Sequence, residues 1–293
     1  MDGGTVREVR RFNRTVTQQV GALDGAFLAR GRPLGHSRVL WEVGPDGAEV
    51  RALRSRLGLD SGYLSRVLRA LQDESLLEVV ADGTDARVRV ARLTDAGRQE
   101  RAELDARSDA GVADLLAPLT AGQQRRLVAA MGEVTRLLEA SMVDVAPEDP
   151  EHPDARHCIA AYVAELGRVF DTGFDPARSI PATADELRPP AGLLLLARLG
   201  SEPLGCAAVK FHGREPAEVK RMWVAPSARG LGLGRRLLGA VEEQARARQV
   251  RTLRLETNRA LVEAIALYRS AGYEEVPAFN DEPFAHHWFQ KRL

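Results

Sequence analysis

Three glycines at alternate positions form the pattern in this sequence that most directly suggests chemistry. Gly230, Gly232 and Gly234 follow an apolar, β-branched run and Pro226, and they lead into a helical pattern of apolar residues. Glycine lets the backbone approach a ligand closely, and the first N–H groups of a helix have no partners inside it. The helix dipole adds a positive field at that end. The stretch therefore predicts a strand, a tight turn and a helix that together form a nest for a phosphate group.

Three classes of glycine loop could produce this pattern. A Walker loop needs Gly-Lys followed by Ser or Thr, which the stretch lacks. A Rossmann loop places its last glycine two residues further on, although Glu256 stands roughly 20 residues downstream, where a ribose-binding acid is expected. Arg229, Gly232 and Gly234 instead fit Arg/Gln-x-x-Gly-x-Gly/Ala, preceded by Val-x-Pro. This stretch resembles the GNAT superfamily of acyl-CoA-dependent N-acetyltransferases, and the likeness continues through residues 255–276.

The resemblance implies that acetyl-CoA is the acyl donor. In such enzymes the end of the central strand parts from its neighbour and binds the pantetheine arm, while the glycine loop binds the pyrophosphate. The glycines could instead serve only the packing of a helix on a sheet. The residues expected to bind the donor are Met222, Trp223, Val224, Arg229, Gly230, Leu231, Gly232, Leu233, Gly234 and Arg235.

Acetyl transfer needs an unprotonated amine and a proton for the departing thiolate. By resemblance, Glu218 occupies the position of a general base in some members, or it only attracts a cationic substrate or pairs with Lys220. Tyr268 corresponds to the tyrosine that commonly protonates the sulfur, or it is a core aromatic residue. Asn258 matches a residue that contacts pantetheine or water, or it caps a helix starting at Arg259. We expect a small amine as the acceptor.

A second chemistry is indicated in the first half of the chain, where arginines outnumber acids between residues 50 and 71. Gly58 lies in a short turn between two helical patterns, and Asp60 or Ser61 can cap the second of them. The second helix has an apolar face, expected to point inward, and an outward Arg/Ser face, which is typical of a helix-turn-helix. Two β-rich runs around Asp82-Gly83 follow and predict a hairpin, here a wing.

This order of elements resembles the MarR family of winged-helix regulators. The resemblance implies a homodimer, formed through the long helices, that binds double-stranded operator DNA. One departure is Ser75-Leu76, where the family usually has Gly-Leu, and the alternative to DNA binding is a solvated arginine face. Asp85 would position the wing arginine. The residues expected at the DNA are Ser61, Gly62, Tyr63, Ser65, Arg66, Arg69 and Arg87.

These residues must be positioned by two domains, because 293 residues exceed one typical domain. The expected fold is a mainly α winged helix-turn-helix domain, residues 1–141, followed by an α/β (α+β) GNAT domain with a mixed sheet, residues 142–293. Helices are predicted at 5–29, 36–43, 49–57, 61–74, 95–116, 120–140 and 155–171, with a further one after the glycine loop. Strands are predicted in the wing and at 143–145, 193–199, 204–211, 219–224, 251–256, 273–278 and 287–292.

Composition limits the remaining classes. No stretch approaches the ~20 uninterrupted apolar residues of a membrane span, and the first residues do not form a signal peptide, so we expect a cytoplasmic protein with no membrane partner. The histidines and the cysteines Cys158 and Cys206 show no ligand spacing, so no metal is expected. The hypothesis is a regulator that is also an N-acetyltransferase. A ligand sensor without turnover and an enzyme merely dimerised by its first domain remain alternatives.

Overall fold

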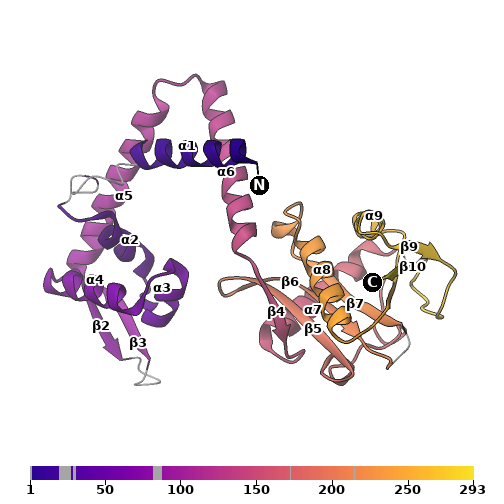
Figure 1. The fold of residues 1–293 in the computed structure, drawn as a ribbon. Coiled ribbons are helices and arrows are strands. Elements are labelled where there is room, and N and C mark those ends of the chain that lie inside the picture. The colour runs from indigo at the N-terminus through magenta and orange to yellow at the C-terminus, as the bar shows by residue number, and fades with distance from the viewer. Residues whose placement is uncertain (1, 20–27, 29–30, 82–87, 172, 214–215) are drawn as a thin grey trace. The chain divides into compact units, whose positions relative to one another are not determined.

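The computed structural model describes residues 2–19, 28, 31–81, 88–171, 173–213 and 216–293 (Figure 1). The chain forms two units, Met1–Ala129 and Ala130–Leu293, each with its own hydrophobic core. Helix α6 begins in the first unit and ends in the second. None of the helices in the described parts combines the length and apolar character that crossing a bilayer requires.

The first unit is mainly helical and contains one small antiparallel sheet in the order β1-β3-β2. The other predicted helices and the two strands of the predicted hairpin are present, but the helix predicted at 5–29 ends at Gln19, and Leu28 has φ of 51° outside it. Strand β1 was not predicted, because a two-residue strand has no periodic pattern to detect. Asp82, Gly83, Asp85 and Arg87, at the tip of the predicted wing, lie outside the described residues. The elements are α1 (Gly3–Gln19), α2 (Leu34–Val43), β1 (Ala48–Glu49), α3 (Val50–Leu57), α4 (Ser61–Asp73), β2 (Leu77–Ala81), β3 (Arg89–Leu93), α5 (Asp95–Leu116) and α6 (Ala121–Met142).

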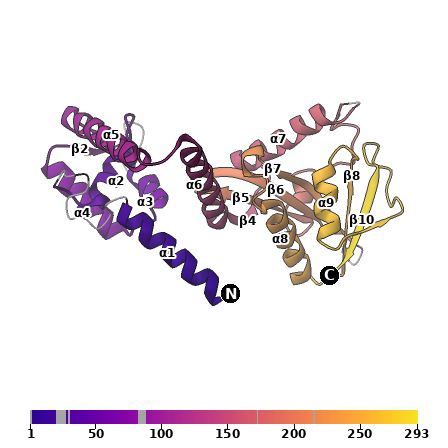
Figure 2. The same ribbon diagram turned by 90° about the horizontal axis from the view of Figure 1, so that it is seen from above.

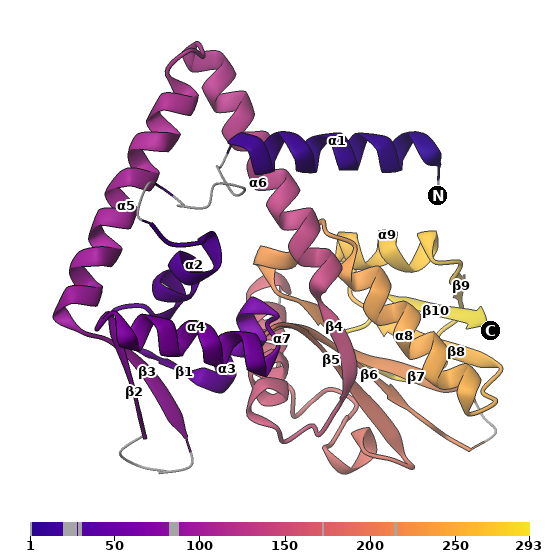
Figure 3. The same cartoon turned by 60° about the vertical axis from the view of Figure 1, so that its left-hand side comes forward.

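The turn between α3 and α4 follows from its residues (Figure 3). Gly58 ends α3 in the left-handed conformation, with φ of 63°. Asp60 then caps α4, since its Oδ1 accepts the Tyr63 N–H at 2.9 Å. The inward face is confirmed, and each buried leucine or valine stabilises the unit by about 1.5–3 kcal/mol. The four residues on this face are Leu64, Val67, Leu68 and Leu71.

Ser75, which stands where the resembled family usually has glycine, adopts a left-handed conformation with φ of 58° between α4 and β2. A residue with a Cβ pays on the order of 1–2 kcal/mol there relative to the right-handed region. The carbonyl oxygen of Ser75 accepts the Thr94 hydroxyl at 2.7 Å, which ties the turn to the start of α5. The chain therefore makes this turn without glycine.

The second unit contains a seven-stranded sheet in the order β4-β5-β6-β7-β8-β10-β9. All neighbours are antiparallel except β7 and β8, so the predicted mixed sheet is confirmed. The elements are β4 (Asp144–Glu148), α7 (Pro153–Val169), η2 (Asp185–Leu187), β5 (Gly192–Leu199), β6 (Glu202–Lys210), β7 (Ala217–Val224), η3 (Pro226–Ala228), α8 (Leu233–Ala247), β8 (Thr252–Thr257), α9 (Val262–Ser270), β9 (Glu274–Val276) and β10 (His287–Arg292).

Helices cover both faces of this sheet (Figure 2). On one face, α7 packs over a core that includes the two free, buried cysteines, Cys158 and Cys206. On the other face, α8 and α9 pack over the larger core, which includes Leu237, Tyr268 and Phe289. The two cysteines thus pack as small apolar residues.

Strands β7 and β8 pair over a short distance only. The paired residues are Ala217 with Leu253 and Glu218 with Arg254. The register of β7 against β6 then shifts between Cys206 and Ala208, and Arg221 has φ of 53°, which marks a β-bulge. Because a bulge bends its strand, β7 leaves β8 before reaching the glycine loop. One edge of its last residues therefore pairs with no strand that the structure describes.

Candidate active site

A pocket of about 580 Å³, here the large pocket, lies where β7 ends, among α7, α9 and the glycine loop. All the residues predicted to bind the donor line it except Leu231, which lines a separate pocket beside the end of α6. The structure thus brings together Met222, Trp223, Val224, Arg229, Gly230, Gly232, Leu233, Gly234 and Arg235.

The glycines of the loop have two different roles. Gly230 and Gly232 have φ of 77° and 75°, a region that favours glycine, and a Cβ on either would meet no atom within 4 Å. They form the turn before α8, whose first N–H groups are free of intrahelical partners. A Cβ on Gly234 would instead lie 3.2 Å from Leu267 Cδ2. Gly234 therefore serves helix packing, whereas the other two shape an open nest.

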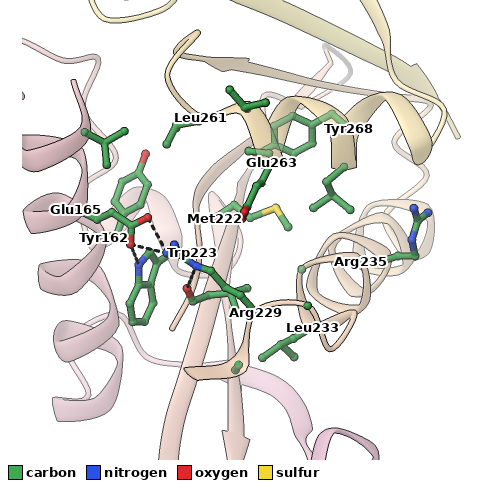
Figure 4. Close-up of a pocket in the computed structure, with 18 of the residues that line it drawn as sticks. Tyr162, Glu165, Met222, Trp223, Arg229, Leu233, Arg235, Leu261, Glu263 and Tyr268 are labelled. Carbon is green, nitrogen blue, oxygen red and sulfur yellow. Dashed lines mark hydrogen bonds and ion pairs between the residues drawn. The ribbon is translucent and has the colours of Figure 1, made fainter. Parts of the chain in front are cut away.

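Arg229 is held by a carboxylate that the sequence did not reveal. Glu165, on α7, accepts a 2.6 Å hydrogen bond from Arg229 Nη2 at each oxygen and a 2.9 Å bond from Trp223 Nε1 (Figure 4). The guanidinium thus joins α7 to the loop, which leaves the backbone N–H groups of the loop to meet a ligand. Glu165 lies in an ordinary amphipathic helix, so no motif could have identified it.

Tyr268 lies between the large pocket and a second pocket of about 100 Å³, since it lines both. Tyr162, from α7, also lines both. Burial raises the pKa of Tyr268 above its usual range and raises the pKa of Tyr162 to about 12. Both phenols are therefore protonated at neutral pH and able to donate a proton.

The second pocket opens where β7 and β8 part. Lys220 lies in its wall, with Nζ 2.5 Å from Glu256 Oε1 and 3.1 Å from Glu218 Oε2. Burial disfavours the charge of Lys220, but the two carboxylates outweigh it and its pKa lies above the usual value. The ammonium therefore stays charged between two carboxylates.

Glu218 and Tyr268 are not brought together around one pocket. Glu218 pairs with Lys220, lies 3.7 Å from His212 Nε2, and lines neither pocket. Glu256 does line the second pocket, together with Tyr268. The sequence had suggested Glu256 only for the Rossmann alternative, because its position at a strand end carries no acetyltransferase signal.

Asn258 also lines the second pocket, in a buried position. Its Nδ2 donates to the Phe284 carbonyl oxygen at 2.7 Å, and its Oδ1 accepts the Ala260 N–H at 2.9 Å. Helix α9 begins at Val262, so the prediction that Asn258 caps a helix starting at Arg259 is wrong. Asn258 instead closes a turn and fixes the segment around Phe284.

In the first unit, α4 presents the residues predicted to meet DNA. Ser61, Gly62, Ser65, Arg66 and Arg69 are exposed. Neither arginine has an ion-pair partner among the residues that the structure describes. Tyr63 is half-buried and packs so closely over Gly35 that a Cβ there would lie 2.2 Å from its hydroxyl oxygen. Arg87, the predicted wing contact, is not among the described residues.

The second unit, which contains this site, is similar to known acetyltransferases. The model of the family described as "Acetyltransferase (GNAT) family" matches residues 160–273. The chain is 33% identical over 139 residues to "IAA acetyltransferase" of Azospirillum brasilense, spanning 47% of this chain and 88% of that protein. It is 36% identical over 127 residues to "N-alpha-acetyltransferase RimI" of Mycobacterium tuberculosis, spanning 42% and 74%. A transcriptional regulator of the MarR family from Rhodococcus sp. RHA1 aligns at a TM-score of 0.38 and 18% identity, over 46% of this chain and 97% of that one.

Proposed function

Because the chain belongs to the GNAT family and is therefore an acyltransferase, we propose that it transfers the acetyl group of acetyl-CoA to the nitrogen of a small amine. The observation that supports this most is the position of Tyr268. Its side chain lines both the large pocket, with its glycine nest, and the second pocket, with its carboxylates. A group at that junction would lie between a bound donor and a bound acceptor.

The large pocket fits acetyl-CoA. Open space next to Gly230 and Gly232 leaves room for a pyrophosphate against the backbone, and the unpaired edge of β7 offers hydrogen bonds to the amides of a pantetheine arm. Acetyl-CoA would supply the thioester, whose C–S bond breaks as the amine nitrogen bonds to the carbonyl carbon. Tyr268 would hold the proton that the departing thiolate takes up.

The acceptor amine must lose a proton before it attacks. Glu256 is the carboxylate that lines the second pocket, and it would accept that proton directly or through water. Glu218, predicted as the base, would act through Lys220, which it helps to keep charged. Asn258 would fix the wall of the pocket near Phe284.

For the first unit we propose binding to double-stranded operator DNA as a homodimer. The turn between α3 and α4, the exposed arginines of α4 and the adjacent β2–β3 hairpin support DNA binding. Exposed apolar residues support the homodimer, because α1 has no buried residue and its Val9 and Phe12 are 54% and 48% exposed. On α6, Leu137 and Leu138 are more than half exposed. These surfaces suit a dimer interface built from the long helices.

The test is release of free thiol from acetyl-CoA in the presence of amines, amino acids and aminoglycosides, together with calorimetry of acetyl-CoA binding. Acetyl transfer predicts acceptor-dependent thiol release and an N-acetylated product by mass spectrometry. Tight binding of acetyl-CoA without turnover for any acceptor would instead support the alternative of a ligand sensor.

A further inference from the structure

Four charged residues line the second pocket, and only two of them form an ion pair with a residue that the structure describes. Lys220 and Glu256 pair with each other at 2.5 Å. Arg221 and Glu282 line the same pocket and have no ion-pair partner among the residues that the structure describes. One guanidinium and one carboxylate are thus left to face the space where an acceptor would bind.

Arg221 sits at the bulge of β7, and its backbone is unusual. Its φ of 53° is rare for a residue with a side chain, and such strained residues occur preferentially at functional sites. Its carbonyl oxygen accepts a hydrogen bond from the Cys206 thiol, with Sγ 3.2 Å away. Its guanidinium lies 5.9 Å from the centre of the Tyr162 ring. The guanidinium therefore belongs to the second pocket and lies beside Tyr162, which lines both pockets. A guanidinium is suited to hold a carboxylate through two parallel hydrogen bonds.

Glu282 is buried, yet it retains capacity to bind a cation. Its Oε2 accepts the Ser179 hydroxyl at 2.9 Å and the Ile180 N–H at 2.7 Å. Its Oε1 accepts only the Phe284 N–H, at 3.3 Å, among the groups that the structure describes. Since a carboxylate has about four acceptor sites, Oε1 can also accept from an ammonium group.

The remaining wall is aromatic. Phe170 and Phe174 follow α7, Phe284 precedes β10, and the three ring centres lie 4.9 to 6.2 Å apart. All three line the second pocket. This surface favours an apolar group on the ligand.

We propose that the acceptor is a zwitterionic amine with an apolar side group, such as an apolar amino acid, whose carboxylate binds Arg221 and whose amino group faces Glu282 and Glu256. The inference rests on the proposed acetyl transfer and names its substrate class. The acceptor's two charges match Arg221 and Glu282, the two groups without an ion pair in the described part of the chain, and its side group lies against the three phenylalanines. Its amino group, once deprotonated, is held beside Tyr268 and the donor.

The experiment compares matched acceptors in the thiol-release assay. Phenylalanine is compared with phenylalaninamide and phenethylamine, and leucine with leucinamide and isopentylamine, over a pH range that corrects for the different amine pKa values. The variants are Arg221→Gln and Arg221→Lys, which keep a side chain at the strained position, with Arg292→Gln as the control at an exposed arginine of β10. Acetyl-CoA affinity is measured for each by calorimetry.

We expect the wild type to favour the amino acids in kcat/KM by about 10- to 100-fold, the effect of one charged hydrogen-bonding pair. Arg221→Gln should remove this preference by raising KM for the amino acids, while KM for the acceptors without a carboxylate and the affinity for acetyl-CoA stay within about twofold. Arg221→Lys should keep part of the preference for amino acids, and Arg292→Gln should keep all of it. Acceptors without a carboxylate that react as well as the amino acids in the wild type, or a preference that survives Arg221→Gln, would overturn the assignment while leaving acetyl transfer intact. No turnover of any of these acceptors would overturn the substrate class, and acetyl transfer itself would be rejected only if the wider screen of amines, amino acids and aminoglycosides also gave no thiol release.

Discussion

Arg236, on the first turn of α8, donates a 2.5 Å hydrogen bond to the carbonyl oxygen of Ala140, on the last turn of α6. Its other terminal nitrogen donates to the Val143 carbonyl oxygen at 2.5 Å, and its backbone N–H donates to the Gly232 carbonyl oxygen at 3.1 Å. The last carbonyl groups of a helix lack partners within it, so Arg236 satisfies one of them. The same residue thus joins the glycine nest to the end of the helix that starts in the first unit.

We predict that this link couples the two proposed functions. Acetyl-CoA should change the affinity for a duplex selected for binding by roughly 5- to 150-fold, and by linkage the duplex should change acetyl-CoA affinity by the same factor. Arg236→Gln should remove the coupling and leave both separate affinities intact. The control is Arg246→Gln, on the same helix, whose partner is Glu242. Equal duplex affinity with and without acetyl-CoA in the wild type would mean that the units act independently.

A substitution at Gly232 should abolish binding of acetyl-CoA without unfolding the protein. Gly232→Asp places a negative charge in the nest, and Gly200→Asp is a matched control in the turn between β5 and β6. Both glycines have positive φ, 75° and 60°, and no atom within 4 Å of an added Cβ. The backbone strain should therefore be similar, about 1–2 kcal/mol. Calorimetry should show reduced affinity for acetyl-CoA in Gly232→Asp only. Unchanged affinity in that variant would mean that the glycine nest does not bind acetyl-CoA.

Tyr268→Phe should lower kcat by about 10²-fold or more and leave acetyl-CoA affinity nearly unchanged, because only the proton donor is removed. Tyr273→Phe is the control. Its ring centre lies 6.1 Å from that of Tyr268, it is also buried, and it lines neither pocket. Steady-state kinetics of both variants separate chemistry from packing. Equal kcat values for the two would assign Tyr268 to the core alone.

Removing Arg66 and Arg69 together should weaken binding to a near-palindromic duplex. The log–log slope of affinity against salt should fall by about 0.9 for each DNA phosphate that is no longer neutralised. The half-sites should lie about one helical turn apart. The control variant is Arg125→Ala with Arg126→Ala, which removes the same charge from α6. Footprints and salt titrations should differ only for the α4 variant. If the two double variants behaved alike, α4 would not be the recognition helix.

The loop before β5 should loosen at low pH. Glu186 accepts hydrogen bonds from Lys210, which lies 2.7 Å away, and from Thr183, and these lower its pKa to about 2. A lowered folded-state pKa means that the stabilisation is present above the unfolded value of about 4.5 and is lost as the pH falls towards 2. The Tm difference between wild type and Glu186→Gln should be constant above about pH 5 and shrink below it. Glu243→Gln, at an exposed site on α8, should show no such change.

Much of the fold could be predicted because its signals are local. The period of apolar residues indicated α4 and its inward face, and the glycine pattern indicated the junction of β7 and α8. The residues of the second pocket were harder to predict from the sequence, because they come together only where β7 and β8 part. Arg221, Glu256 and Glu282 belong to three separate segments. The local sequence suggested Glu256 only as a ribose-binding acid, and nothing near Arg221 or Glu282 distinguishes them from ordinary surface charges. Glu165 was missed for the same reason.

The free edge at the end of β7 also has a consequence for the behaviour of the protein in concentrated solution. An unpaired strand edge is a template that strands of other molecules can join, which is how many proteins begin to aggregate. Here the edge lies inside the sheet, between β7 and β8, and α7 and α9 stand beside it. The gap is thus shielded from long strands while a thin, amide-bearing chain can still enter. A ligand in that position would hydrogen-bond to β7 as another strand would, and so would remove an unpaired, aggregation-prone edge near the centre of the sheet.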